Sequence, residues 1–273
     1  MSADAGAEII RTENLTKRFG SQIAVHRVNY VLCENEVAGI IGSNGAGKTT
    51  FFNLLTGYYP PDAGTILYRG EDVTHASPEK RVDMGMMRTF QLTSTFDNLR
   101  VIDNLVLAFF RAHVSASLLP LFMTTCRRYR GEERIVQCLE TFELQNEANK
   151  QVKNLSLGEK RRLEIAMAIL AEPKILLLDE PLAGLAETEI KGVLGVLAKH
   201  VGKQTILIVE HKISQVEGFL KRLTVMHDGN VIADGSCEEC LRAPEVRRSY
   251  WQLGTPAEGA DGTCTQGAHG DAE

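Results

Sequence analysis

The fold is decided by the stretch Gly42-Ser43-Asn44-Gly45-Ala46-Gly47-Lys48-Thr49. It fits the phosphate-binding loop pattern G-x-x-x-x-G-K-[ST]. An apolar segment with strand character, residues 37–41, leads into it, and a helical pattern follows over residues 50–55. A plain glycine turn is the alternative explanation, but a chance match seldom has both flanking elements. The sequence therefore predicts an anion site made of backbone N–H groups and a helix N-terminus.

Two side chains of this loop are predicted to act on the bound anion. Lys48 is expected to reach the β- and γ-phosphates of a nucleotide, and the Thr49 hydroxyl to hold Mg²⁺. The loop glycines permit backbone conformations and close approaches that a Cβ atom would block. By itself the loop predicts only that the protein binds a nucleotide.

The composition is that of an ordinary globular protein. Of the 273 residues, 44% are hydrophobic and 24% are charged, with a formal net charge of −5. Residues 254–273 hold four acids and no Lys or Arg, so the rest of the chain is close to neutral, which argues against a nucleic-acid partner. The six cysteines are scattered, as expected for free thiols. No apolar run approaches the roughly 20 residues of a membrane helix. Residues 1–8 are polar, so we expect a cytoplasmic protein.

The hydrophobic pattern predicts an α/β core that is interrupted by a helical region. Residues 175–178 and 205–209 are continuous apolar runs, typical of strands buried on both faces of a parallel sheet. Residues 92–153 carry no strong strand signal, whereas 101–111 and 132–144 have helical periodicity.

The ends of the core are predicted to contain further strands and a helix. Residues 9–15 and 23–32 are predicted strands, joined by a turn at 17–20 that carries Phe19. Residues 213–220 are predicted to be helical.

Polar residues follow the two buried strands. Asp179, at the end of the first, suits the role of a Mg²⁺ ligand, and Glu180 suits a carboxylate that polarises water. Two solvent-facing acids at a strand end are the alternative. His211 closes the second apolar run, where a lone histidine is usually a surface residue.

A capping pattern precedes a helix in the second half of the chain. Ser156 has the position of an N-cap, and Gly158 follows two residues later. A cap and a glycine at a helix N-terminus can also form an anion site, although an ordinary cap is the simpler explanation. Gln91 follows residues 88–90 and is by default a surface amide.

Taken in this order, these features resemble the ATP-binding cassette (ABC) transporter ATPase family over residues 9 to about 253. The resemblance implies an α/β fold, namely a P-loop NTPase core with an antiparallel β subdomain and an inserted α-helical subdomain at about 92–165. Residues 254–273 are then expected to be a disordered acidic tail. The implied activity is hydrolysis of ATP with Mg²⁺, coupled in a dimer to transport.

The resemblance also implies roles for individual residues. Glu180 is the implied catalytic base, His211 contacts the γ-phosphate, and Gln91 touches Mg²⁺ and the attacking water. Phe19 stacks on adenine, and the signature residues near Ser156 close over the ATP of the opposite protomer. The implied nucleotide-binding residues are Phe19, Gly42, Ser43, Asn44, Gly45, Ala46, Gly47, Lys48, Thr49, Thr50, Ser156, Gly158 and Glu159. The implied ligands of Mg²⁺ are Thr49, Gln91 and Asp179.

Within the family, four segments look like those of the importers of branched-chain and hydrophobic amino acids. These segments are 86–91, 98–105, 161–166 and the long insert near 112–130. Urea and amide importers share much of the pattern, and the lipopolysaccharide-export ATPase is similar but lacks such an insert. Soluble non-transport members typically carry two cassettes or a long coiled coil, and this chain has neither. A GTPase is disfavoured because no Asn-Lys-x-Asp occurs.

The implied partners are integral-membrane permease subunits on separate chains and a second ATPase subunit, identical or different. An extracytoplasmic solute-binding protein would take part indirectly. The resemblance therefore places the protein on the inner face of the cell membrane.

The chain departs from the family pattern at two motifs. Leu157 and Glu159 stand where the signature motif usually has glycine and glutamine. Ala186-Glu187 stands where the D-loop, which crosses the dimer interface in this family, usually has Asn/Asp-Pro. Losing that polar side chain is expected to loosen coupling between the two ATP sites.

Two other patterns have no assigned role. Cys237 and Cys240 have metal or redox spacing, but no second pair accompanies them, and a capping box of Ser236 and Glu239 explains the local sequence. The apolar run 118–123 suits either interior packing or a surface that docks a membrane partner.

Overall fold

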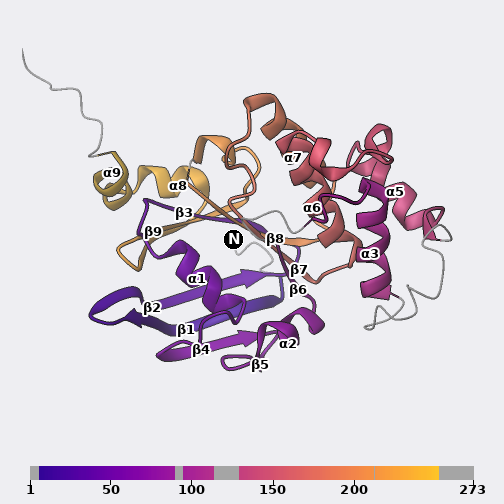
Figure 1. Ribbon diagram of the computed structural model, residues 1–273. Helices are drawn as coiled ribbons and strands as arrows, with labels where there is room; N and C mark the ends of the chain where they lie inside the picture. Colours follow the sequence, from indigo (N-terminus) through magenta and orange to yellow (C-terminus); the bar gives the residue numbers. More distant parts are fainter. Residues whose placement is uncertain (1–5, 90–94, 114–128, 212, 252–273) are drawn as a thin grey trace, which may run out of the picture.

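The computed structural model describes residues 6–89, 95–113, 129–211 and 213–251. Its strands form two sheets, which face each other across a helix (Figure 1). The antiparallel sheet has the order β2-β1-β4-β5, from Gln22–Cys33, Glu8–Phe19, Ala63–Tyr68 and Glu71–Asp72. The larger sheet has the order β10-β9-β3-β8-β7-β6, from Asn230–Gly235, Arg222–His227, Val37–Gly42, Thr205–Glu210, Ile175–Asp179 and Met86–Thr89.

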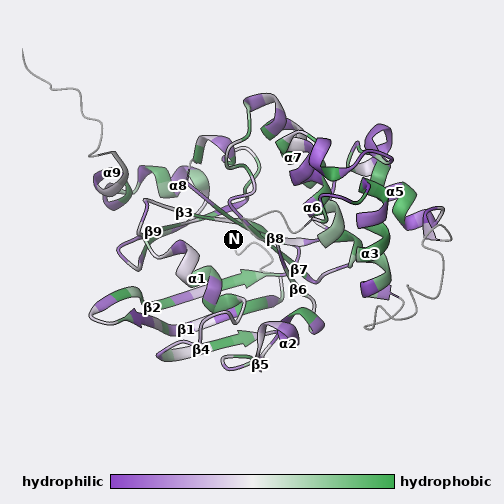
Figure 2. Ribbon diagram, viewed as in Figure 1, coloured by the Kyte–Doolittle hydropathy of each residue, from purple (hydrophilic) through white to green (hydrophobic). Residues whose placement is uncertain are grey.

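The helices cover both faces of the larger sheet. The α-helices are α1 Lys48–Leu55, α2 Pro78–Asp83, α3 Val101–His113, α5 Glu133–Thr141, α6 Leu157–Leu170, α7 Glu187–Ala198, α8 Cys237–Arg242 and α9 Pro244–Trp251. Short 3₁₀ turns are η2 Gln145–Glu147, η3 Val152–Asn154 and η4 Ile213–Gln215. Figure 2 shows hydrophobic residues along β1, β2 and α3, the elements that pack against the core.

The central strands separate two hydrophobic clusters because successive side chains point to opposite faces. Ile175 and Leu177 of β7 pack with Phe51 of α1 and with the antiparallel sheet. Leu176 and Leu178 pack instead with α3, α5, α6 and α7. Every residue of β3, β7 and β8 is buried, which explains their continuous apolar runs. The predicted α/β core with an antiparallel sheet is therefore confirmed.

Two local predictions are wrong. Residues 17–19 belong to β1 and not to a turn, because β1 pairs with β2 as far as Phe19 opposite Gln22, and the chain reverses only at Gly20. Residues 213–220 form the 3₁₀ turn η4 followed by further turns, not an α-helix. Gly218 interrupts the segment, and Leu220 packs so closely on β3 that a Cβ on Gly39 would lie 2.3 Å from it.

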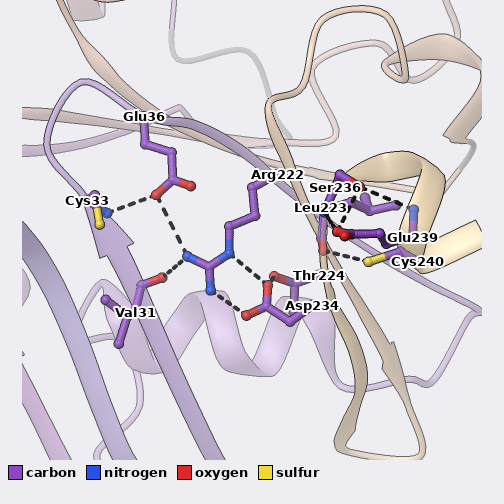
Figure 3. Close-up of polar contacts among 10 residues, drawn as sticks. All are labelled: Val31, Cys33, Glu36, Arg222, Leu223, Thr224, Asp234, Ser236, Glu239 and Cys240. Carbon is purple, nitrogen blue, oxygen red and sulfur yellow. Dashed lines mark hydrogen bonds and ion pairs between the residues drawn. The ribbon is translucent and has the colours of Figure 1, made fainter. Parts of the chain in front are cut away.

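An arginine joins the two sheets at the amino end of β3 and β9 (Figure 3). Arg222 donates to Val31 O of β2 at 2.6 Å and forms a two-point ion pair with Asp234 of β10. Glu36 lies 3.8 Å from the same guanidinium and accepts a hydrogen bond from the Cys33 N–H. Burial opposes this charge, but the hydrogen bonds and charge of Asp234 outweigh it, so the pKa of Arg222 is raised.

The Cys237–Cys240 segment is a helix start, as the capping box predicts. Ser236 Oγ accepts from the Glu239 N–H, and Glu239 accepts from the Ser236 N–H (Figure 3). Cys240 is buried and its thiol donates to Leu223 O at 3.1 Å. Within the described ranges, no cluster of His, Cys, Asp and Glu has the arrangement of a metal site.

No helix in the part of the chain that the structure describes is long and apolar enough to span a bilayer. The run 118–123 and residues 254–273 lie outside the described residues, so the predictions for them stay predictions.

Candidate nucleotide site

The predicted phosphate loop lies between β3 and α1, as the strand–loop–helix pattern requires. Gly47 is the N-cap of α1 and has a φ of 97°, where a side chain is strained. A Cβ on Gly47 would lie 2.2 Å from Ala24 O, and one on Gly42 would lie 2.4 Å from Met226 O. Glycine is therefore required at both positions to bring the loop against β2 and β9.

Lys48 lies folded back over the loop that precedes it. Its Nζ donates to Gly42 O at 2.7 Å and to Ser43 O at 3.0 Å. Burial lowers the pKa of Lys48, although the nearby carboxylates of Glu180, Asp179 and Glu210 act in the opposite direction. A buried ammonium whose two shortest hydrogen bonds go to carbonyl oxygens is well suited to exchange them for phosphate oxygens.

The carboxyl ends of the parallel strands bring the remaining candidates to the same edge of the sheet (Figure 1). Asp179 ends β7, and Glu180 follows with a φ of 48°. Glu210 ends β8 and His211 follows it. The structure therefore brings Lys48, Asp179, Glu180 and His211 together, although they are far apart in sequence.

A chain of hydrogen bonds links three of these side chains. Lys48 Nζ lies 3.3 Å from His211 Nδ1, and His211 Nε2 lies 2.6 Å from Glu180 Oε1. An ammonium has only donors, so Nδ1 must accept. The Nε2–H then donates to Glu180, which fixes the tautomer and orients the carboxylate.

Asp179 is held by one oxygen and leaves the other unpaired. Arg88 Nη2 of β6 donates to Asp179 Oδ2 at 2.7 Å, while Arg88 Nη1 donates to Asn53 Oδ1 of α1 at 2.6 Å. Asp179 Oδ1 is buried and has no hydrogen-bond partner. An unpaired buried carboxylate oxygen is costly and fits a cation that binds with the nucleotide. The Thr49 hydroxyl, in the first turn of α1, is exposed and available as a second oxygen ligand.

Glu210 supports the loop after β7. Its Oε1 accepts from the Leu182 N–H at 2.9 Å, and its Oε2 accepts from the His211 N–H at 3.4 Å. Burial is the main cause that raises the pKa of Glu210 to about 7, and the charge of nearby Glu180 acts in the same direction. The hydrogen bonds from the Leu182 and His211 N–H groups and the charge of Arg161 lower this pKa.

The predicted adenine platform is an exposed aromatic pair. Phe19 at the end of β1 is 46% exposed and contacts Tyr59 edge-on, with ring centroids 5.4 Å apart. Lys17 Nζ lies 5.7 Å from the Phe19 ring centroid. An exposed ring of this kind has a free face on which a base can stack.

The signature residues are at the N-terminus of α6, and their described hydrogen bonds go to each other and to α7. Ser156 is the N-cap, with its Oγ accepting from the Glu159 N–H and its own N–H donating to Glu159 at 2.7 Å. The Gly158 N–H donates to Glu189 of α7 at 3.0 Å. The structure does not bring these residues to the phosphate loop of the same chain.

Gln91 lies outside the described residues, so its predicted contacts stay predictions. The strand before it, β6, ends at Thr89 opposite Leu178 of β7. The chain therefore leaves the sheet at the edge where Asp179 lies.

Three site residues were missed by sequence reasoning: Arg88, Glu210 and Glu189. An arginine inside an otherwise apolar strand and an acid at the end of a buried strand were available as signals for Arg88 and Glu210. Nothing local distinguishes Glu189 from its neighbours in the polar first turn of α7.

Comparison with known proteins identifies the class of this cassette. The family described as ABC transporter matches residues 25–183. A branched-chain amino acid transport ATP-binding protein of Escherichia coli, LivG, is 38% identical over 247 residues, which cover 89% of this chain and 97% of LivG. The corresponding protein BraF of Pseudomonas aeruginosa is 36% identical with the same coverage.

Solved structures give the same result. A nucleotide-free ATP-binding cassette from an ABC transporter aligns with a TM-score of 0.75 at 30% identity, covering 89% of this chain and 98% of that structure. A cassette in its ADP conformation aligns with a TM-score of 0.76 at 30% identity and the same coverage. The chain therefore belongs to the ABC transporter family and has the fold of its ATPase cassettes. The family resemblance predicted from the motifs is confirmed.

Proposed function

We propose that this chain is the ATP-hydrolysing subunit of an importer for branched-chain or other hydrophobic amino acids. The observation that carries the proposal is the near full-length similarity to LivG and BraF, whose names describe high-affinity branched-chain amino acid transport. The cluster of Lys48, Glu180 and His211 supports hydrolysis rather than nucleotide binding alone.

In the proposed reaction, water attacks the γ-phosphorus in line while the bond from phosphorus to the ADP oxygen breaks, so that ADP leaves and the water gives a proton to Glu180. The protein acts by positioning and electrostatics. The loop N–H groups and Lys48 hold the phosphates. Glu180, oriented by His211, accepts a hydrogen bond from the attacking water and aligns it. His211 also lies beside Lys48, where its ring would face the γ-phosphate.

Mg²⁺ fits the same edge. When bound, it would neutralise negative charge on the phosphate groups. Asp179 Oδ1 and the Thr49 hydroxyl are the described groups that would hold it, with Gln91 as the third proposed ligand. Arg88 keeps the Asp179 carboxylate from turning away, because it occupies Oδ2.

We also propose the assembly that the family resemblance implies. Two ATPase subunits, identical or different, would bind two ATP between them, with Ser156, Gly158 and Glu159 of one subunit facing the ATP of the other. Separate permease subunits would carry the solute across the membrane after delivery by a solute-binding protein. The ATPase would then lie on the inner face of the membrane, with residues 9–253 as the cassette, 92–165 as its helical subdomain and 254–273 as a tail.

A groove lies beside the site. It has a volume of about 610 Å³ and is lined by apolar residues of β6, α3 and α6, among them Met87, Ala108 and Met167. Arg111 and Lys174 lie at the same groove, and Arg88 lines it while pairing with Asp179. Arg88 therefore connects the wall of this groove to the proposed Mg²⁺ ligand Asp179.

The test is ATP-driven uptake by the complex purified from its native membranes and reconstituted in vesicles with its solute-binding protein. We expect labelled leucine to accumulate in the vesicles when ATP is present. Labelled urea and labelled acetamide should not accumulate. Uptake of urea or an amide would move the protein to the related importers. A soluble dimer that carries no permease through purification would contradict transport altogether.

Glu180→Gln serves as the inactive reference in the same assay. It should keep ATP binding, trap a dimer and lose at least about 100-fold in phosphate release, because general-base positioning contributes on the order of 10²–10⁴. Near-normal turnover of this variant would refute the role of Glu180.

A further inference from the structure

Two loops that the sequence marks as unusual lie against each other at the N-termini of α6 and α7. One comprises Leu157 and Gly158 at the start of α6, and the other comprises Gly184 and Ala186 just before α7. Leu157 is 41% exposed, and its Cδ2 would lie 3.3 Å from a Cβ on Gly184. The departures at Leu157 and Ala186 therefore lie on two neighbouring segments.

The polar link between these loops is Glu189 of α7. Its Oε1 accepts from the Gly158 N–H at 3.0 Å, and its Oε2 accepts from the Ala186 N–H at 3.1 Å. The Ala186 N–H bond and then the Gly158 N–H bond lower the pKa of Glu189, so the carboxylate stays ionised. One side chain thus holds one amide from each loop.

The carboxylate can reach Gly158 only because this residue has no side chain. A Cβ on Gly158 would lie 2.7 Å from Glu189 Oε1 and 2.9 Å from its Cγ. The first-turn N–H groups of a helix are natural anion ligands. In α6 the Glu159 N–H is taken by Ser156 and the Gly158 N–H is taken by Glu189. The anion site at this helix N-terminus is therefore already filled by an anion of the same chain.

We propose that Glu189 is a positioning residue that occupies the Gly158 N–H until the ATP of a second subunit takes it. The proposal rests on the proposed function, in which the signature residues face that ATP. One N–H makes one strong hydrogen bond, so the carboxylate and a phosphate oxygen compete for it. The Glu189 carboxylate and a phosphate group would also repel each other if both approached the same N–H, because both are negatively charged.

Displacement of Glu189 has a consequence for the second loop. The same carboxylate restrains Ala186, which has no polar side chain of its own to cap α7. When the Gly158 bond is lost, the carboxylate and the Ala186 amide are released from α6 together. Binding of ATP at one site thereby releases the loop that follows Glu180, which belongs to the other site. Glu189 takes over the coupling role that the missing Asn or Asp at position 186 leaves open.

The test measures how much ATP is needed to form the dimer. Glu189→Gln and Glu187→Gln are each made in the Glu180→Gln background, and the dimer fraction is followed by light scattering against Mg-ATP concentration. Both substitutions remove one negative charge from the first turn of α7, but only Glu189 contacts Gly158. We expect Glu189→Gln to lower the half-maximal ATP concentration about two- to fivefold, the range of charge effects at helix ends, and to lower it by more than Glu187→Gln does.

An unchanged or increased ATP requirement in Glu189→Gln overturns the proposal, since Glu189 would then only stabilise the two loops. Glu189→Asp keeps the charge but is too short to hold both amides, so it should fall between the parent and Glu189→Gln. If Glu189→Asp needs the same ATP concentration as the parent to form the dimer, charge alone matters. This result would also overturn the proposal.

Amide exchange in the ATP-free chain separates this proposal from the proposed function. By NMR, the Gly158 and Ala186 amides should exchange faster in Glu189→Gln than in Glu187→Gln. If the Glu180→Gln chain forms no dimer with ATP, the proposed two-subunit reaction fails, and the exchange rates still decide whether Glu189 holds both loops. Equal exchange in the two variants rejects the contact itself.

Discussion

Charged side chains at the two ends of the large sheet differ in how they are paired. At the amino end, the Arg222 guanidinium is matched by Asp234, Glu36 and Val31 O (Figure 3). At the carboxyl end, Asp179 Oδ1 has no partner, and Lys48 carries a pKa that burial has lowered. At the amino end the charged groups are paired within the chain, although the buried Tyr30 hydroxyl beside Arg222 has no hydrogen-bond partner. At the carboxyl end a charged atom, Asp179 Oδ1, is left for a ligand.

This difference separates stability from function within a single sheet. A satisfied network contributes to folding in the absence of anything else. An unsatisfied cluster costs folding free energy, which is returned only when a ligand binds the native state. Glu180, with its φ of 48°, adds backbone strain at the same end. Substitutions at the two ends should therefore differ in whether Mg-ATP compensates for them.

The largest effect is expected for Lys48→Ala at the carboxyl end. Removing a buried, hydrogen-bonded charge from a ligand contact costs about 2–5 kcal/mol, so ATP affinity should fall roughly 30-fold or more. The unliganded protein should be as stable as the parent or slightly more so, because Lys48 is a desolvated cation there. Isothermal titration with Mg-ATP and urea unfolding measure the two quantities, with the exposed Lys203→Ala as the control. Unchanged affinity would contradict the phosphate-loop assignment.

Arg222→Met at the amino end should show the reverse pattern. It leaves Asp234 and Glu36 without their cation, and losing such charge-assisted hydrogen bonds at a partly buried site costs about 2–3 kcal/mol in the free energy of unfolding. Mg-ATP should raise the melting temperature of the variant by no more than it raises that of the parent, since the ligand does not reach this end. A larger ligand-induced shift would show that the two ends are not independent.

Arg88→Met tests the same contrast inside the site. Asp179, which is 1% exposed, then loses its counter-ion, and we expect a loss of about 2–3 kcal/mol in stability. Here Mg-ATP supplies a replacement cation, so it should stabilise the variant more than the parent. ATP with a chelator in place of Mg²⁺ should not have this effect. Equal shifts in parent and variant would argue against Asp179 as a Mg²⁺ ligand.

Most of the fold could be predicted from sequence because it is encoded locally. Glycine spacing marks the loop, and continuous apolar runs mark β7 and β8. Once the strands are parallel neighbours, Asp179, Glu180 and His211 must share an edge. Where a local pattern depends on distant partners it misleads: pairing with β2 carries β1 on to Phe19, and packing of Leu220 on Gly39 stops the helix predicted at 213–220.

The residues that tune the site could not be predicted in this way. Arg88 acts on a carboxylate 91 positions away, and Glu189 acts on an amide 31 positions away. Each is defined by a tertiary contact that has no sequence period. Such contacts require the coordinates of both partners, so the structure adds them to the motifs rather than correcting the motifs.

The smallest effect in this comparison is the pH response of Glu210. Its pKa is about 7 in the folded chain because of burial, above the ordinary value of 4.5, so the native state binds the proton more tightly than the unfolded state. Stability from this group is complete below pH 4.5 and is lost as the pH rises to about 7. The parent should therefore lose about 1–3 kcal/mol relative to Glu210→Gln between pH 5 and 8.

Urea unfolding of both proteins at each pH measures the difference, and other titrating groups such as His200 cancel in it. Exposed Glu217→Gln is the control and should follow the parent. A difference between parent and Glu210→Gln that stays constant with pH would mean that Glu210 is ionised throughout this range.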